Sequence, residues 1–476
     1  MSKKIQQVYP LLFTLSVIFL SACIPHSDPN PTQKVAGTPE PAAISGDSEK
    51  CEDFIKKMPS NYYYGWISVP ENYEKPEESP QIRVFYYGPK GDFKEHIVFF
   101  NGGPGSDSHY NYTLFDKSFT QMNIAKDKLG FVYIDQRGNG CSSPYPAVSN
   151  KNDILRLRFY GSSSIVRDAE NVRKFLFGEQ KWKIFGQSYG AFVVHRYVTL
   201  FPDSITTAYA HANAITLDPM DRMTERIYSQ YTVMLMYLKQ HPDDRKRLQL
   251  LYDFFKDKDK CFKNAQGIEF CGYEINQTLI SNLGFFNQWN RLHDALKYLV
   301  PYEKNKTAKV SLEKIKQYVS KLKLPVRTNN GHSYAMPVLA LYDRNVIDLN
   351  FQSCTEIYNK ILSKYKITPE KMILNECLPE LQRQESPKKW LQVVDAFQTS
   401  GISFDHLHLD QFIFSLKKMN SDQFYLYSGE KDTFVPKAIF NNEISMTADL
   451  LIYRHFLNSG HEGFFTENTI LEDLLR

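Results

Sequence analysis

The short segment Gly186-Gln187-Ser188-Tyr189-Gly190 constrains the fold of this chain more than any other feature. An apolar run, residues 181–185, leads into it, and a second apolar run, residues 191–200, follows it. A serine flanked by glycines at this spacing is typical of a tight turn between a β-strand and an α-helix, which exposes the serine hydroxyl. Side chains at the two glycine positions would collide with the neighbouring strand and helix. The segment therefore predicts a strand–turn–helix unit with Ser188 as a candidate nucleophile.

Strand-like and helix-like segments alternate on both sides of this turn. Two short apolar runs, residues 96–100 and 131–134, each end in a glycine-rich loop and suit buried parallel strands. Residues 162–178 have apolar side chains at helical spacing, and residues 205–212 form another strand-like run. This alternation predicts an α/β domain with a mainly parallel sheet and helices on both of its faces.

The alternation stops near residue 217 and resumes near residue 411. Residues 218–410 have a mostly helical pattern, which predicts a large helical cap inserted into the sheet domain. Residues 51–217 and 411–476 are then the first and second parts of that domain. The second part contains two further strand-like runs, residues 423–427 and 450–456.

The N-terminus has the pattern of an export signal. Two lysines precede an apolar stretch, residues 11–20, which is too short for a comfortable transmembrane span. The next residues, up to Cys23, resemble a bacterial lipobox, so we expect residues 1–22 to be a lipoprotein signal peptide and Cys23 to carry the lipid. Residues 23–50 are rich in small residues and proline, which predicts a flexible tether.

This N-terminus predicts an exported protein, anchored by its lipid to the bacterial cell envelope, at the outer membrane or facing the periplasm. The alternative is a plain signal peptide followed by a fortuitous cysteine. The net charge of +4 is too close to neutral to suggest a nucleic acid as partner.

The chain contains seven cysteines, of which Cys23 is assigned to the lipid. An even number remains, and in an exported chain this suggests disulfide bonds. Pairing nearest neighbours along the sequence gives Cys261–Cys271, Cys354–Cys377 and, by elimination, Cys51–Cys141. Neither a CxxC nor an HExxH motif occurs, so no metal site is expected.

A serine nucleophile needs a base, and the base needs an acid that orients it. In a sheet of this kind the acid and then the histidine are expected just after later strands. Asp432 follows the strand-like run 423–427, and His461 follows the run 450–456. We therefore expect Asp432 to orient His461, and His461 to take the proton from Ser188.

Four other residues compete for these roles. Glu430 is an alternative acid, although Asp432 is preferred because it precedes a turn that ends in proline. Glu462 is interpreted as a polar residue at the rim. His455 lies within the last predicted strand, and His195 lies on the helix after Ser188, where it should point away from the site.

The first glycine-rich loop is Asn101-Gly102-Gly103-Pro104-Gly105. It follows a strand, and enzymes whose serine nucleophile lies on a strand–turn–helix unit place part of the oxyanion hole in such a loop. We expect the backbone N–H groups of Gly103 and Tyr189 to be its donors. The loop contains no GK[ST] sequence, which argues against phosphate binding.

Together, five motifs resemble those of the prolyl aminopeptidase family of α/β-hydrolase serine peptidases: Asn101–Gly105, Asp135–Gly140, Gly186–Gly190, Gly429–Asp432 and Gly460-His461. The longer exported members, such as tripeptidyl aminopeptidases, are the more similar. The resemblance implies an α/β-hydrolase fold with a helical cap. It also implies hydrolysis of short peptides from the N-terminus by Ser188, Asp432 and His461, without a cofactor.

The resemblance differs from the family pattern at one position. Residue 101 is asparagine where the smaller prolyl enzymes have histidine, which weakens the case for strict proline specificity. In the Asp135–Gly140 motif, Arg137 is expected to hold the loop rather than to touch substrate. We expect a monomer that acts on a peptide. A carboxylic-ester hydrolase of the same fold and a non-catalytic lipoprotein remain as alternatives.

Overall fold

The computed structural model describes residues 48–109, 129–215, 219–256, 261–265, 267, 269–272, 279, 282–302, 307–321, 330–344, 351–367, 385–463 and 467–475. Residues Ile44–Arg476 form one compact unit. The predicted signal peptide, its lipid-attachment site at Cys23 and most of the predicted tether lie outside the described residues. Helix α1 (Ser48–Lys57) begins within the last residues of the predicted tether.

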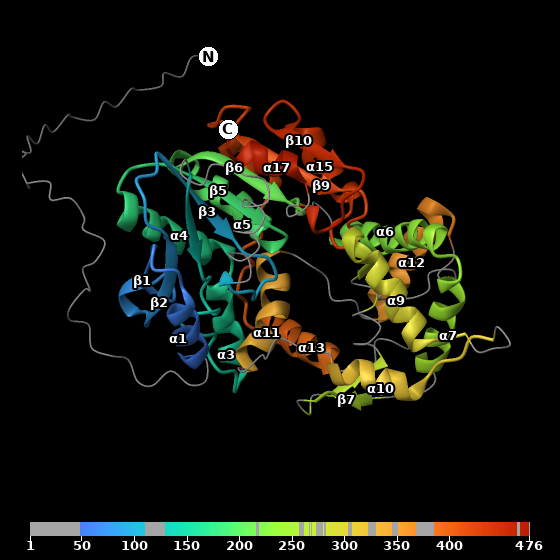
Figure 1. The fold of residues 1–476 in the computed structure, drawn as a ribbon. Helices are drawn as coiled ribbons and strands as arrows, with labels where there is room; N and C mark the ends of the chain where they lie inside the picture. Colours follow the sequence, from blue (N-terminus) through green and yellow to red (C-terminus); the bar gives the residue numbers. More distant parts are fainter. Residues whose placement is uncertain are drawn as a thin grey trace, which may run out of the picture. The chain divides into compact units, whose positions relative to one another are not determined.

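An eight-stranded sheet forms the core of this unit, with the strand order β1-β2-β4-β3-β5-β6-β9-β10 (Figure 1). Strand β2 is antiparallel to β1 and to β4, and all the other neighbouring pairs are parallel. The predicted mainly parallel sheet is thus confirmed. The strands are β1 (Tyr62–Pro70), β2 (Gln81–Pro89), β3 (Glu95–Phe100), β4 (Leu129–Ile134), β5 (Trp182–Gln187), β6 (Ile205–His211), β9 (Phe424–Gly429) and β10 (Ile452–Phe456).

Both faces of the central strands are buried, which explains their unbroken apolar runs. In β3, Val98 and Phe100 pack into one hydrophobic cluster. Their neighbours Ile97 and Phe99 point to the opposite face and pack with the aromatic side chain of Phe185. Successive side chains of a strand alternate between the two faces, so a run without polar residues contributes to two cores.

Helices cover each of these cores. On one face pack α4 (Ser162–Phe177), α5 (Tyr189–Leu200), α14 (Leu409–Leu416) and α15 (Lys437–Thr447). On the other face pack α1 and α17 (Asn468–Leu474). None of the helices in the described part of the chain combines the length and the apolar character needed to cross a bilayer.

A mainly helical segment lies between β6 and α14, and we call it the insert. Its helices are α6 (Pro219–Gln240), α7 (Asp244–Lys256), α9 (Trp289–Leu299), α10 (Leu312–Lys321), α11 (Asn330–Val338), the π-turn η6 (Leu339–Asp343), α12 (Phe351–Tyr365) and α13 (Glu385–Gln398). It also contains the short hairpin of β7 (Cys261–Lys263) and β8 (Glu269–Cys271), and the 3-10 turns η4 (Asn282–Gly284) and η5 (Phe286–Gln288).

The insert has an apolar core of its own and a second core that it shares with the sheet domain. Helices α6, α7, α9 and α10 pack around one another. Helices α11 and α13 pack instead on α3 (Lys151–Arg156) and on the 3-10 turn η2 (Leu157–Tyr160). The remaining short turns are η1 (Pro76–Glu78) and η3 (Pro202–Ser204).

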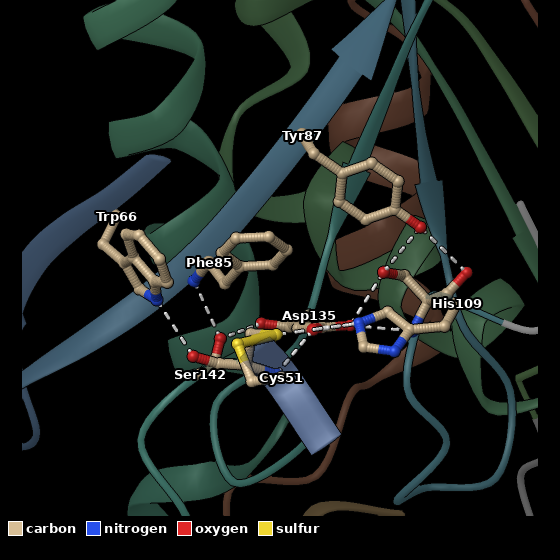
Figure 2. Close-up of a disulfide and its surroundings, with 9 residues drawn as sticks. Cys51, Trp66, Phe85, Tyr87, His109, Asp135 and Ser142 are labelled. Carbon is tan, nitrogen blue, oxygen red and sulfur yellow. Dashed lines mark hydrogen bonds and ion pairs between the residues drawn. A yellow bond between two sulfur atoms is a disulfide. The ribbon is translucent and has the colours of Figure 1, made fainter. Parts of the chain in front are cut away.

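A disulfide joins Cys51 on α1 to Cys141 in the loop after β4 (Figure 2). The indole nitrogen of Trp66 donates to the carbonyl oxygen of Cys141 at 3.0 Å. Beside the bond, the buried carboxylate of Asp135 accepts the N–H of Cys141 at 2.7 Å. The disulfide confirms the predicted pairing of Cys51 with Cys141.

Cys261 and Cys354 are also disulfide-bonded. Across the β7–β8 hairpin, the backbone of Cys261 lies opposite that of Cys271. The side chain of Cys271 and the whole of Cys377 lie outside the described residues, so these two pairings stay predictions.

Arg137, from the loop after β4, is fully buried and is saturated with hydrogen bonds. Its guanidinium donates to both carboxylate oxygens of Asp168 on α4, at 2.7 and 2.6 Å. It also donates to the carbonyl oxygens of Glu71 and Phe159, each at 2.7 Å, and lies over the ring of Tyr73. Arg137 therefore ties the loop to α4 and to the chain after β1.

Replacing this arginine, as Arg137→Met, should lower the free energy of unfolding by about 3–5 kcal/mol. The substitution leaves the buried carboxylate of Asp168 without its counter-charge. Urea denaturation followed by circular dichroism measures the change. The exposed Arg245 on α7 provides a matched control, because Arg245→Met should change stability by less than about 0.5 kcal/mol. Equal effects of the two substitutions would contradict the assigned role of Arg137.

His211, the last residue of β6, is fully buried. Within the described part of the chain, neither of its ring nitrogens has a hydrogen-bond partner. Burial, and secondarily the nearby His461, lowers the pKa of His211 to about 3. Between about pH 6.5 and pH 3, the unfolded chain therefore binds a proton at this residue that the native protein does not bind.

Stability should consequently fall as the pH decreases below about 6.5, with His211 contributing about 1.4 kcal/mol per pH unit. His211→Gln should reduce this slope, and His408→Gln, at an exposed histidine, should leave it unchanged. Urea midpoints measured at pH 7.5 and pH 5.0 give the comparison. The same acid sensitivity in wild type and His211→Gln would show that other groups cause it.

Candidate active site

Ser188 occupies a strained turn between β5 and α5. Its backbone has φ 56° and ψ −120°, a combination that residues with side chains rarely adopt. The N–H of Ser188 donates to the carbonyl oxygen of His211 at 2.9 Å, which anchors the turn to β6. The predicted strand–turn–helix unit is present around the candidate nucleophile.

The two flanking glycines permit close backbone contacts. A Cβ atom added to Gly186 would lie 2.1 Å from the carbonyl oxygen of Gly190. A Cβ atom added to Gly190 would lie 2.0 Å from the carbonyl oxygen of Phe100 on β3. Any side chain at either position would force the helix away from the sheet, so glycine is required at both positions.

Asp432 and His461 lie side by side in the loops after β9 and β10. The Oδ2 atom of Asp432 lies 2.7 Å from Nδ1 of His461. The Oδ1 atom accepts the backbone N–H groups of Phe434 and Val435, at 2.8 and 2.9 Å. The two amides orient the buried carboxylate, so its other oxygen is directed at the imidazole.

The sheet brings this pair to the edge on which Ser188 lies. His211, the last residue of β6, is the register partner of Gln187, the last residue of β5, and of Tyr427, near the carboxyl end of β9. The side-chain amide of Gln187 donates to the carbonyl oxygen of His461 at 2.7 Å. Among the described residues, the Oγ of Ser188 makes no hydrogen bond to the imidazole, and such a contact commonly tightens only when substrate binds.

Both competing histidines are engaged elsewhere. His455 bonds to Ser428 at 2.8 Å and to Glu430 at 2.6 Å, which also removes Glu430 as the partner of His461. His195, on α5, is fully buried and contacts Glu443 of α15 at 2.8 Å. Asp432 is therefore the acid that the structure pairs with His461.

Glu462 differs from its sequence interpretation as a polar residue at the rim, because it is only 5% exposed. Its carboxylate accepts the backbone N–H of Gly460 at 3.4 Å and that of Asn287, in the insert, at 3.3 Å. Burial raises the pKa of Glu462. The residue is covered because turns η4 and η5 of the insert lie against the loop of His461.

The glycine-rich loop lies against the candidate nucleophile. A Cβ atom added to Gly102 would lie 3.3 Å from the Cβ of Ser188 and 3.9 Å from its Oγ. Gly103 has φ 108°, which favours glycine, and Gln136 holds the loop by donating to the carbonyl oxygen of Asn101 at 3.1 Å. Tyr189 begins α5, so its N–H is one of those that have no acceptor within the helix. The donor roles of Gly103 and Tyr189 stay predictions.

The insert contributes contacts that no sequence motif indicated. The N–H of His461 donates to the carbonyl oxygen of Gly284 at 2.7 Å. The ring of Phe285 meets the imidazole edge-on, and Phe434, from the loop of Asp432, packs against it. From α6, the hydroxyl of Ser229 reaches the carbonyl oxygen of Asp432 at 3.4 Å. The insert therefore touches both loops, the one that carries Asp432 and the one that carries His461.

Among the residues that the structure describes, two groups of side chains have the composition of metal ligands. In the first, His109 bonds to Asp135 at 3.1 Å, and Cys141 is in the disulfide, so no thiolate is available. In the second, on the insert, Asp244 contacts His293 at 2.8 Å and also accepts from Arg247 and Tyr237; His241 completes the group. Neither group contains a residue of the predicted triad.

Comparison with known proteins agrees with this architecture. The family model of the alpha/beta hydrolase fold matches residues 95–468. A proline iminopeptidase from Aeromonas sobria is 26% identical over 173 residues, which are 34% of this chain and 39% of that protein. One from Aspergillus aculeatus is 24% identical over 210 residues, 40% of this chain and 46% of the relative. The chain thus spans less than half the length of the curated relatives it matches.

Among solved structures, a proline iminopeptidase-related protein from Thermus thermophilus aligns with a TM-score of 0.35 and 12% identity, covering 86% of this chain and 95% of that chain. The sequence similarities confirm the predicted resemblance to prolyl aminopeptidases. The family match extends over most of the chain and includes Ser188, Asp432 and His461. The chain therefore belongs to the alpha/beta hydrolase fold family.

Proposed function

We propose that this protein is a serine exopeptidase of the aminopeptidase type, which releases residues or short peptides from the N-terminus of peptides. The 2.7 Å contact between Asp432 and His461, on the sheet edge that carries Ser188, is the observation that supports a serine mechanism. The relatives named proline iminopeptidases support a peptide as the substrate and its N-terminus as the end that is cleaved.

The chemistry follows from the hydrogen-bonding capacity of each group. An ionised carboxylate only accepts, so Asp432 holds the Nδ1–H of His461 and leaves Nε2 basic. Nε2 takes the proton of the Ser188 hydroxyl as its oxygen attacks the scissile carbonyl carbon. The same proton then passes to the leaving amine, and water hydrolyses the acyl-enzyme by the reverse sequence of proton transfers.

The developing negative charge falls on the carbonyl oxygen of the substrate. In this proposal the N–H groups of Gly103 and Tyr189 stabilise it, and losing one such donor typically costs about 2.7–4 kcal/mol of transition-state stabilisation. Gly102 lies close to Ser188, which supports this role for the loop.

Ser188→Ala and Asp432→Asn should each lower kcat/KM for aminoacyl or tripeptidyl anilides by at least about 10⁴-fold. A matched control is Glu430→Gln, two residues from the acid, because Glu430 pairs with His455 instead. The control should stay within a few-fold of wild type. A fluorophosphonate should label wild type and leave Ser188→Ala unlabelled.

The wild-type enzyme and these variants should also be tested on free peptides, on the same peptides after N-acetylation, and on simple acyl esters. An aminopeptidase cleaves the free peptides and spares their acetylated counterparts, because the amino terminus must fit the site. Faster hydrolysis of the esters than of every peptide would favour the carboxylic-ester hydrolase instead. Full peptidase activity in Ser188→Ala would disprove the serine mechanism.

We also propose that the protein is exported and lipid-anchored through Cys23, on the evidence of the sequence Leu20-Ser21-Ala22-Cys23. Cells grown with an alkyne fatty acid should yield labelled wild-type protein in the membrane fraction. Cys23→Ala should lose the label because alanine has no sulfur atom to which the lipid can be attached. A labelled Cys23→Ala protein would contradict the proposal.

A further inference from the structure

One face of helix α6 is directed at the catalytic loops and carries positive charge. Arg222, Arg226 and Ser229 are spaced by four and three residues, so they share this face. Ser229 reaches the carbonyl oxygen of Asp432. Arg222 is 7% exposed, and its Nη2 lies 3.4 Å from the side-chain oxygen of Asn213.

Asn213 connects this arginine to the nucleophile. Its side-chain amide donates to the carbonyl oxygen of Ser188 at 2.9 Å. Arg222 is therefore two hydrogen bonds away from the backbone of the candidate nucleophile.

A second arginine approaches the elbow from another part of the insert. Arg344 follows the π-turn η6, and its guanidinium lies 5.7 Å from the ring centroid of Tyr189 and 5.8 Å from that of Phe192. Tyr189 is the residue directly after Ser188. The Nε atom of Arg344 is buried and has no hydrogen-bond partner among the described residues.

The nearby carboxylates are already engaged by other groups. Asp343 accepts from the hydroxyl of Ser162 at 2.6 Å and from that of Tyr189 at 3.0 Å, and it lies 3.5 Å from Arg196. Asp432 accepts two backbone amides and contacts His461. Within the described part of the chain, neither Arg222 nor Arg344 forms an ion pair with a carboxylate.

Arg222 is also repelled by the two neighbouring arginines, Arg226 on α6 and Arg344 after η6. Burial, and then the neighbouring Arg344 and Arg226, lowers the pKa of Arg222. A desolvated guanidinium is costly unless an anion compensates it, and arginine is the residue that best matches the planar geometry of a carboxylate. The arrangement contrasts with buried Arg137, whose hydrogen bonds are all satisfied within the chain.

We propose that Arg222 and Arg344 bind a carboxylate of the substrate close to the scissile bond. This inference rests on the proposed peptidase function and specifies its substrates. They are peptides with an acidic side chain next to the cut, or short peptides whose free C-terminal carboxylate reaches the same position. In both cases the guanidinium groups bind the anion while Ser188 attacks the neighbouring carbonyl carbon.

Paired substrates test this inference and separate the two sources of the carboxylate. Glutamyl anilide against glutaminyl anilide tests the side chain, and di-alanine against its C-terminal amide tests the chain end. At least one carboxylate member should have a kcat/KM about 10- to 100-fold above its amide, as a charged hydrogen bond predicts. Ratios near one for both pairs in wild type would overturn the inference and leave the peptidase function standing.

Variants locate the effect. Arg222→Met and Arg344→Met should each reduce the carboxylate-to-amide ratio toward one, whereas Arg245→Met, at the exposed arginine on α7, should keep the wild-type ratio. Urea midpoints verify that each variant is folded. A wild-type ratio that persists in both active-site variants would overturn the inference.

A binding measurement does not depend on peptide turnover. Glutarate should protect Ser188 of the wild-type enzyme from fluorophosphonate labelling, and the neutral glutaramide should protect it less. The protection by glutarate should weaken in Arg344→Met. Equal protection by the two compounds would overturn carboxylate binding, and protection without cleavage of any peptide would instead overturn the peptidase function.

Discussion

The contact between the backbone of Gly190 and the carbonyl oxygen of Phe100 is the constraint on which the site depends. Only a glycine lets helix α5 begin this close to β3, because an added Cβ atom would lie 2.0 Å from that oxygen. The helix start then places Ser188 in its strained conformation and Tyr189 at a free helix end. The glycine-rich loop begins directly after Phe100, so the same contact brings this loop beside Ser188. Ser188 and the loop are thus positioned by close packing of two backbones.

The features that the sequence predicts well are the ones that local chemistry determines. The apolar runs identify the strands because these are buried on both faces, and the elbow requires its glycines wherever it occurs. The pairing of Asp432 with His461 could be expected because each follows a strand whose carboxyl end must lie at the same edge of the sheet as Ser188. Arg137 could be interpreted correctly from its place in a loop, and its hydrogen bonds to Asp168 explain that role.

Tertiary contacts decide the features that the sequence does not predict. Glu462 looks like a rim residue because it is charged and lies in a loop, yet turns of the insert cover it. The contacts of Phe285, Arg222 and Arg344 depend on how the insert folds back on the sheet domain, and no motif in the insert records that path. Helical periodicity alone places arginines on one face of α6 and does not show that this face meets Asp432 and Asn213.

The main-chain hydrogen bond between His461 and Gly284 affects how the insert can change during evolution. Both partners are backbone groups, so substitution of most insert side chains leaves the bond in place. Gly284 is the exception, because an added Cβ atom would lie 2.5 Å from the Thr433 hydroxyl. The insert can therefore diverge in sequence while His461 keeps its support. Most side chains of the insert can change in this chain without moving the histidine.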